Sequence, residues 1–157
     1  MLCRAETPWN PMIAPVAICQ SATRIEEPLR VLLVEDDQEA ADLVRVYLNE
    51  QREERFHLEW ISDLLDAMFR LQHSGVDVIL LDLGLPERDG DKSFRGIQGM
   101  TEGKIPIVIL TSDDRRTSRD LILGSGAAEY LTKQSLSGPE LRYALREAVL
   151  QYCRTTP

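Results

Sequence analysis

Polar side chains that could carry out chemistry follow four short apolar stretches of the sequence. They are Glu35, Asp36 and Asp37 after residues 31–34, Asp82 after 76–81, Thr111 and Ser112 after 105–110, and Lys133 just beyond 129–131. If each stretch is a strand of one parallel sheet, the four carboxyl ends meet at the edge where such sheets bind ligands. The sequence therefore predicts one pocket that contains several carboxylates, a hydroxyl group and an ammonium group.

Carboxylates that share a pocket repel one another, and at least one of their pKa values rises unless a cation joins them. Oxygen ligands with one or two carboxylates suit Mg²⁺, which keeps several waters and binds phosphate oxygens. A carboxylate beside such an ion can attack phosphorus and form an aspartyl phosphate. Asp82 is the expected acceptor because it stands alone at the end of a central strand. Lys133 and the Thr111 hydroxyl are expected to stabilise the charge of the transferred group.

Each of these residues also has an ordinary structural explanation when it is taken singly. A strand-end Asp or Thr is more often a helix cap or a turn former than a catalytic group. A single lysine such as Lys133 is usually a solvated surface charge. Capping does not explain why suitable side chains follow four different strands, so the chemical interpretation depends on that coincidence.

Hydrophobic patterns predict the elements that position these side chains. The expected strands are 31–34, 56–61, 76–81, 105–110 and 129–131, and the expected helices lie around 43–48, 63–71, 92–100, 114–123 and 137–152. Asp63 is expected to cap the second helix, and Ser137 and Glu140 form a capping box for the last one. Strands that alternate with helices indicate an α/β fold. We expect a doubly wound, five-stranded parallel sheet of the flavodoxin-like kind, with helices on both faces.

Composition narrows the choice of function. The 157 residues are enough for about one domain, since domains usually have ~100–200 residues. The 26 Asp and Glu outnumber the 18 Lys and Arg and give a net charge of −8, which disfavours nucleic acid and anionic membranes as partners. No apolar run approaches the ~18 residues of a membrane span. Cys3, Cys19 and Cys153 lack metal-ligand spacing and suit a reducing cytoplasm.

The first 28 residues differ from the rest of the chain. They contain four prolines and show no sustained periodicity. We expect residues 1–28 to be a disordered leader, or to result from a start codon assigned too far upstream, and residues 29–154 to form the domain. Two prolines and the lack of a cleavage site disfavour a signal peptide at residues 11–19. Because the chain ends just past the last helix, no second domain is expected.

Residues 30 to about 153 resemble the receiver domain of two-component response regulators. The segments that carry the resemblance are 31–37 (VLLVEDD), 81–90 (LDLGLPERDG), 106–112 (PIVILTS) and 126–133 (GAAEYLTK). The resemblance implies the following roles: Asp82 as phosphoacceptor, Mg²⁺ held by Glu35, Asp36, Asp82 and the backbone carbonyl of Gly84, Thr111 as switch hydroxyl, Lys133 as the phosphate-pairing cation, and Tyr130 as the aromatic side chain that turns inward or outward.

The resemblance also implies a stand-alone, cytoplasmic response regulator of the chemotaxis-regulator kind, a monomer or weak dimer. A histidine kinase or a histidine phosphotransfer protein would phosphorylate it. It would signal to a downstream effector protein through the surface of the fourth helix, the fifth strand and the fifth helix. It would be no enzyme, apart from its own phosphorylation and dephosphorylation.

One residue departs from the family pattern. Family members usually carry a proline in a cis peptide directly after the lysine, and here Gln134 follows Lys133. A cis bond before a residue other than proline costs ~2.5–4 kcal/mol. Either this bond is trans in a reshaped loop, or strain is stored there.

Three other functions compete with phosphoacceptance. A nucleotide enzyme is disfavoured because the turn after the first strand is acidic and lacks the glycine pattern that binds a pyrophosphate. A phosphatase with an aspartyl phosphate intermediate needs a general acid two residues after Asp82, where the sequence has Gly84. The remaining alternative is an interaction module of the same fold that does not use phosphate.

Overall fold

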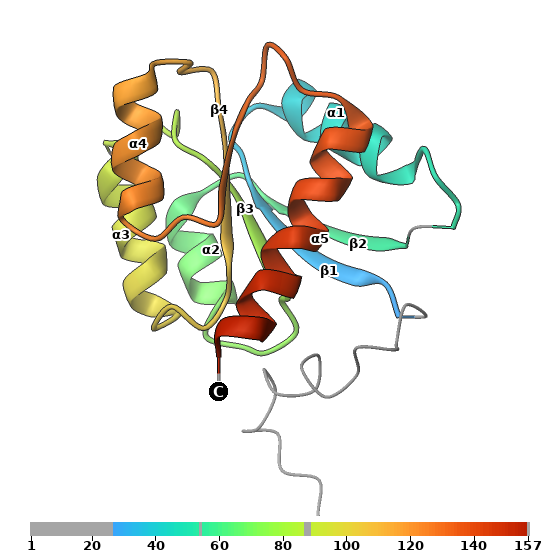
Figure 1. Cartoon of the computed structure of the whole chain (residues 1–157), viewed down its shortest axis with the longest axis horizontal. Coiled ribbons are helices and arrows are strands. Elements are labelled where there is room, and N and C mark those ends of the chain that lie inside the picture. The colour runs from blue at the N-terminus through green and yellow to red at the C-terminus, as the bar shows by residue number, and fades with distance from the viewer. Residues whose placement is uncertain (1–26, 54, 87–88, 157) are drawn as a thin grey trace, which may run out of the picture.

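The five strands of the described residues form one parallel sheet with the order β2-β1-β3-β4-β5. The computed structural model describes residues 27–53, 55–86 and 89–156 (Figure 1). The strands are β1 (Leu29–Val34), β2 (Phe56–Ile61), β3 (Val78–Asp82), β4 (Ile107–Thr111) and β5 (Glu129–Thr132). The helices are α1 (Gln38–Asn49), α2 (Leu64–Arg70), α3 (Gly90–Met100), α4 (Arg116–Gly124) and α5 (Gly138–Thr155). The predicted fold class is confirmed.

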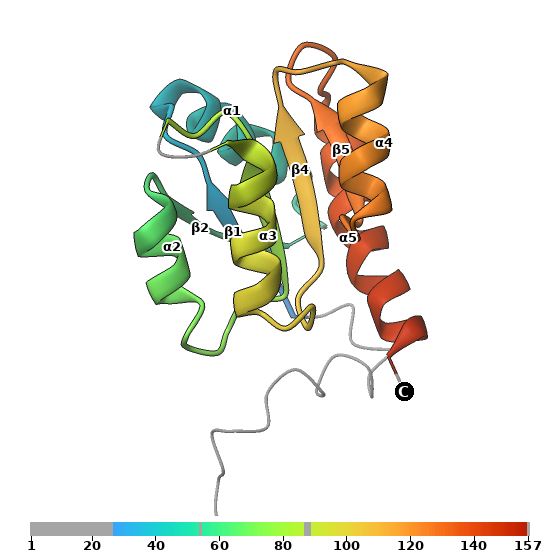
Figure 2. The same ribbon diagram turned by 90° about the vertical axis from the view of Figure 1, so that its left-hand side faces the viewer.

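Different helices cover the two faces of the sheet. Helices α1 and α5 pack on one face, and α2, α3 and α4 pack on the other, which Figure 2 turns toward the viewer. The strands β3 and β4 are buried at every residue, as the continuous apolar runs predicted for strands covered on both sides. This arrangement fixes where the strand ends lie relative to one another.

Side-chain caps fix the starts of three helices. The Asp63 carboxylate accepts a hydrogen bond from the backbone N–H of Asp66 (3.0 Å), which confirms the predicted cap of α2. The Ser137 hydroxyl accepts from the N–H of Glu140 (3.4 Å), as the capping box predicted for α5. Asp37 caps α1 in the same way. Of the three acidic residues after β1, the last therefore has a structural role.

The strands β3 and β4 begin two residues later and end one residue later than predicted. Before β3, the carboxylate of Asp77 accepts hydrogen bonds from the backbone N–H of Arg30 (2.8 Å) and from its guanidinium group (2.7 and 3.0 Å). Before β4 stands Pro106, which has no N–H to donate to a neighbouring strand. The later ends make Asp82 and Thr111 the last residues of their strands.

Helix α4 also begins two residues later than predicted. The carboxylate of Asp113 accepts a hydrogen bond from the backbone N–H of Arg115 (3.0 Å), and this turn precedes the helix. Asp and Asn favour such turns because their side chains bond the backbone two residues on. The side chain of Asp113 therefore stabilises the β4–α4 loop, and hydrophobic periodicity does not predict such a contact.

Some predictions lie outside the described residues. They include residues 1–26 of the leader expected over residues 1–28, the apolar segment 11–19, Cys3 and Cys19. Within the part of the chain that the structure describes, no helix combines the length and apolarity needed to cross a membrane.

Candidate functional site

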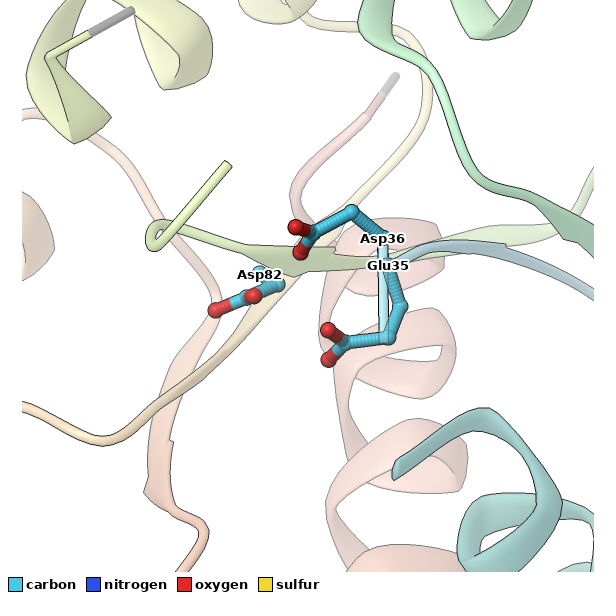
Figure 3. Close-up of side chains that lie close together, drawn as sticks. All are labelled: Glu35, Asp36 and Asp82. Carbon is cyan, nitrogen blue, oxygen red and sulfur yellow. The ribbon is translucent and has the colours of Figure 1, made fainter. Parts of the chain in front are cut away.

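Three carboxylates meet at the carboxyl ends of β1 and β3. Glu35 and Asp36 directly follow β1, and Asp82 ends β3. One oxygen of each carboxylate lies within 4.8 Å of the others, and the three side chains face a common space in Figure 3. Glu35 and Asp82 are buried, whereas Asp36 is exposed. The sequence predicted this convergence from the parallel arrangement of the strands, and the structure brings all three residues together.

The ammonium group of Lys133 lies between two of these carboxylates. Its Nζ is 2.7 Å from Glu35 Oε2 and 3.2 Å from Asp82 Oδ2. Lys133 follows β5, two strands away from β3 in the sheet. The backbone holds it there, because its N–H donates to the carbonyl of Thr111 at 2.8 Å. Among the described residues, one ammonium group therefore pairs with two of the three clustered acids.

Burial and crowding change the protonation of this cluster. Burial raises the pKa of Glu35 to about 7, and the nearby negative charge of Asp82 adds to this effect. The ion pair with Lys133 and the backbone N–H of Asp37 act in the opposite direction. Burial opposes the charge of Lys133, but Glu35 and Asp82 together raise the pKa of its ammonium group. The cluster therefore has an excess of negative charge near neutral pH.

The hydroxyl of Thr111 lies at the end of β4, in the wall of the same cavity. This cavity has a volume of about 720 Å³ and is also lined by the three carboxylates and Lys133. Thr111 Oγ1 accepts a hydrogen bond from the N–H of Asp113 (3.2 Å), and the carbonyl of Asp113 accepts one from the hydroxyl of Tyr130 (2.9 Å). One residue of the β4–α4 loop thus connects the hydroxyl in the cavity with the aromatic residue of β5.

The sequence matches the response regulator receiver domain family over residues 31–146. The chain belongs to this family. Two-component signalling by phosphorylation is typical of the family, and the five-stranded fold agrees with that of receiver domains.

Similar proteins include a response regulator and a transcriptional regulatory protein. The chain is 37% identical to the response regulator protein PmrA of Pseudomonas aeruginosa over 107 residues, which are 67% of this chain and 46% of that protein. It is 32% identical to KdpE of Escherichia coli over 127 residues, or 80% of this chain and 53% of KdpE. The chain therefore spans about half the length of these relatives. The functions of their remaining parts are not assigned to this chain.

Solved receiver domains share the fold. The receiver domain of the Francisella response regulator 1452 has a TM-score of 0.67 and 27% identity, with 83% of this chain and all of that chain covered. The receiver domain of the sensor histidine kinase PA1611 from Pseudomonas aeruginosa has a TM-score of 0.65 and 26% identity, and covers 78% of this chain and 98% of its own. That structure has a magnesium ion coordinated in its active-site cleft.

The residue that departs from the receiver domain pattern has a defined contact. No cis peptide bond occurs among the described residues, so the Lys133–Gln134 bond is trans, which is the first of the two alternatives drawn from the sequence. The Gln134 side-chain amide donates to the carbonyl of Ser112 at 2.9 Å. It therefore connects the β5–α5 loop, which carries the lysine, with the β4–α4 loop.

The structure also shows the surroundings of two other residues predicted for the site, Tyr130 and Gly84. Tyr130 is fully buried, more than its place on a short edge strand suggested. The N–H of Gly84 donates to Asp82 Oδ1 at 3.0 Å, and a side chain at this position would touch the Asp82 carboxylate. The role of the Gly84 carbonyl as a metal ligand stays a prediction.

Sequence patterns missed several contacts around the site. The carboxylate of Asp113 is bound by the guanidinium group and the backbone N–H of Arg115, and these bonds lower its pKa. The indole of Trp60 donates to the carbonyl of Glu35 at 2.7 Å. The register of β1 against β2 places Trp60 opposite Leu33, two residues before Glu35. Only a correct alignment of these two strands could have suggested the contact between Trp60 and Glu35.

Proposed function

We propose that this receiver domain accepts a phosphoryl group on Asp82 and transmits the change to the surface of α4, β5 and α5. The donor is a histidine kinase or a histidine phosphotransfer protein, the reaction takes place in the cytoplasm, and a protein reads the altered surface. The domain acts as a phosphoacceptor and turns over no substrate besides its own phosphoryl group. The observation that carries the proposal is the position of the Lys133 ammonium group between two of the three clustered carboxylates.

The donor set fits a magnesium ion. Among the described residues, the three carboxylates have one neighbouring ammonium group, which leaves an excess of negative charge. Burial is the main cause of the raised pKa of Glu35, and the negative charge of Asp82 adds to it. Hard oxygen ligands of this kind suit Mg²⁺, and we propose that Glu35, Asp36, Asp82 and the carbonyl of Gly84 arrange it. The bound ion would neutralise charge on the transferred phosphoryl group.

The chemical step is a substitution at phosphorus. An oxygen of the Asp82 carboxylate attacks the phosphorus of a phosphohistidine, a P–O bond forms, and the P–N bond breaks with its electron pair on the leaving imidazole. Asp82 is held for this attack because Oδ1 accepts from the N–H of Gly84 and Oδ2 faces Lys133. The ammonium group of Lys133 then neutralises charge on the phosphoryl oxygens.

Transmission begins at Thr111. Its hydroxyl accepts from the N–H of Asp113, and a phosphoryl group on Asp82 would draw this hydroxyl toward itself. Asp113 also holds the hydroxyl of Tyr130, and the guanidinium group of Arg119 in α4 lies 6.0 Å from the centre of the Tyr130 ring. A change at Thr111 therefore reaches α4 and β5 through directly bonded groups.

Transmission is tested with Thr111→Val, which keeps the β-branched shape and removes the hydroxyl. The amide chemical shifts of α4 and β5 are compared before and after phosphorylation. We expect Thr111→Val to accept phosphate and to lose most of the shift changes in α4 and β5. Full shift changes in this variant would exclude the Thr111 route while leaving phosphoacceptance intact.

Phosphoacceptance is tested by incubation with acetyl phosphate and Mg²⁺, followed by intact mass spectrometry. We expect an adduct of one phosphoryl group that is absent from Asp82→Asn and present in Asp91→Asn. Asp91 is a suitable control because its carboxylate lines the same cavity but pairs with Arg95 outside the acidic cluster. An unmodified wild-type protein would favour the alternative, an interaction module that does not use phosphate.

A further inference from the structure

Both backbone groups of Glu35 are held by the neighbouring strand β2. The N–H of Glu35 donates to the carbonyl of Ile61 at 3.1 Å. Its carbonyl accepts from the indole Nε1 of Trp60 at 2.7 Å. The strand β2 ends at Ile61, and the chain then turns into α2, whose N-cap is Asp63. A side chain thus holds the carbonyl of Glu35 at the point where the strand ends.

The position of this carbonyl matters for the acidic cluster. The carbonyl of Glu35 belongs to the peptide group that connects Glu35 with Asp36, and a peptide group is planar. A hydrogen bond that fixes this plane limits the directions in which the Asp36 side chain can leave the backbone. Asp36 is exposed and follows the strand, so few other contacts restrict it.

The side chain of Trp60 is itself well fixed. It is half-buried and packs against the apolar cluster between the sheet and helices α1 and α5. Because the ring is held by packing, its N–H can hold the Glu35 carbonyl without losing much side-chain entropy. The indole is therefore a rigid donor placed behind the acidic cluster.

We propose that Trp60 is a positioning residue that orients Glu35 and Asp36 for a divalent cation. The inference rests on the proposed function, since it concerns the same magnesium site. Residues that orient metal ligands without touching the metal often change metal affinity by about 10–100-fold when they are replaced. Trp60 acts through the backbone of its neighbours and makes no contact with a reacting atom.

Magnesium affinity of the whole chain tests this role. The variant Trp60→Phe keeps an aromatic ring and removes the N–H donor. Leu58→Val is the matched control, because Leu58 lies on the same strand and packs against the same apolar cluster. Dissociation constants are measured by titration of Mg²⁺, followed by the amide chemical shifts of Asp82 and Gly84, together with the melting temperature of each variant.

We expect Trp60→Phe to weaken magnesium binding by about tenfold and Leu58→Val to leave it within about twofold of wild type, a ratio in the range known for outer-shell residues. Equal affinity in Trp60→Phe and wild type would overturn the inference and leave the proposed function intact. Equal weakening in both variants would also overturn it, because general packing of β2 would then be the cause. A wild-type protein that does not bind Mg²⁺ would overturn both the inference and the proposed magnesium site.

A second measurement uses the unmodified indole and does not depend on how Trp60→Phe folds. The indole N–H resonance of Trp60 should shift during the Mg²⁺ titration with the same midpoint as the amide of Asp82. The variant Trp9→Phe assigns the resonance, because the chain contains two tryptophans. An indole resonance that stays unchanged while the Asp82 amide shifts would contradict the coupling.

Discussion

Two aspartates flank the same central strand, and their surroundings differ. Asp77 precedes β3, and its two carboxylate oxygens receive three hydrogen bonds from the backbone and guanidinium group of Arg30. Asp82 ends β3 and shares Lys133 with a second buried acid, Glu35. Among the residues that the structure describes, Asp77 is matched by one cation, Arg30, whereas the acidic cluster at the end of β3 contains more acids than cations. The matched pair stabilises the fold, and the unmatched cluster is suited to bind a further cation.

The largest expected effect is the difference between Asp82→Asn and Asp77→Asn in phosphorylation and in stability. Asp82→Asn should abolish the phosphoryl adduct and keep or raise the melting temperature, since it removes repulsion within the acidic cluster. Asp77→Asn should keep the adduct and lower the free energy of unfolding by about 1–3 kcal/mol, because hydrogen bonds to a buried charged group are weakened. Mass spectrometry and thermal unfolding of both variants check this. A stability loss for Asp82→Asn as large as that for Asp77→Asn would contradict the distinction.

The next largest effect is on the rate of phosphorylation and distinguishes the cations Lys133 and Arg30. Lys133→Met should slow phosphorylation by acetyl phosphate by about 10²–10³-fold, the usual cost of removing one group that stabilises charge in the transition state. Arg30→Met should leave the rate unchanged and lower stability, because the buried carboxylate of Asp77 loses the guanidinium group and keeps only the backbone N–H of residue 30 as a donor on that side. The rates of adduct formation at saturating Mg²⁺ give the comparison. A slow Arg30→Met variant would show that the ends of β3 are not independent.

A smaller, graded effect follows from the raised pKa of Glu35, about 7 in the folded protein against 4.5 for an ordinary glutamate. Protons compete with Mg²⁺ for this carboxylate, so magnesium affinity should fall by up to about tenfold per pH unit as the pH drops below 7. Without Mg²⁺, the folded protein binds more protons than the unfolded chain between pH 4.5 and 7. The free energy of unfolding should therefore decrease as the pH rises through this range.

Titrations of Mg²⁺ at several pH values check this dependence, with Glu35→Gln as the control. Because glutamine does not titrate, the variant should bind Mg²⁺ more weakly and with a flatter pH profile. A pH profile of Glu35→Gln as steep as that of wild type would assign the titration to another group.

The smallest effect is expected at Gln134. Its side chain connects the lysine loop with the carbonyl of Ser112, and this bond lies at the surface. Gln134→Ala should lower the free energy of unfolding by about 0.5 kcal/mol, the lower end for a net hydrogen bond. It should also shift the amide resonances of Ser112 and Asp113. Unchanged resonances in both loops would show that the bond contributes nothing in solution.

The sequence predicts more of the acidic cluster than of the contacts that support it. Glu35, Asp82 and Lys133 were found because strand ends meet at one edge of a parallel sheet, which requires only the order of strands and helices along the chain. The pair Arg30–Asp77 joins residues 47 positions apart. Such a contact depends on the register of neighbouring strands and on side-chain directions, neither of which hydrophobic periodicity specifies.

Element boundaries show the same limit. The caps Asp63 and Ser137 were predicted because each bonds to a backbone group within three residues. The start of α4 was predicted two residues too early, since the turn at Asp113 replaces the first helical residues with a local side-chain bond. Polar side chains that bond locally can either begin a helix or delay it, and composition alone does not separate the two.

The most direct test of the central claim locates the phosphoryl group in the chain. Wild-type protein is phosphorylated with acetyl phosphate, with Mg²⁺ or with a chelator, and is then reduced with borohydride, which converts an aspartyl phosphate to homoserine. If Asp82 is the phosphoacceptor, peptide mass spectrometry will find homoserine at position 82 in the sample with Mg²⁺ and none in the sample with the chelator. Homoserine at another aspartate, or equal labelling in both samples, would contradict this role of Asp82.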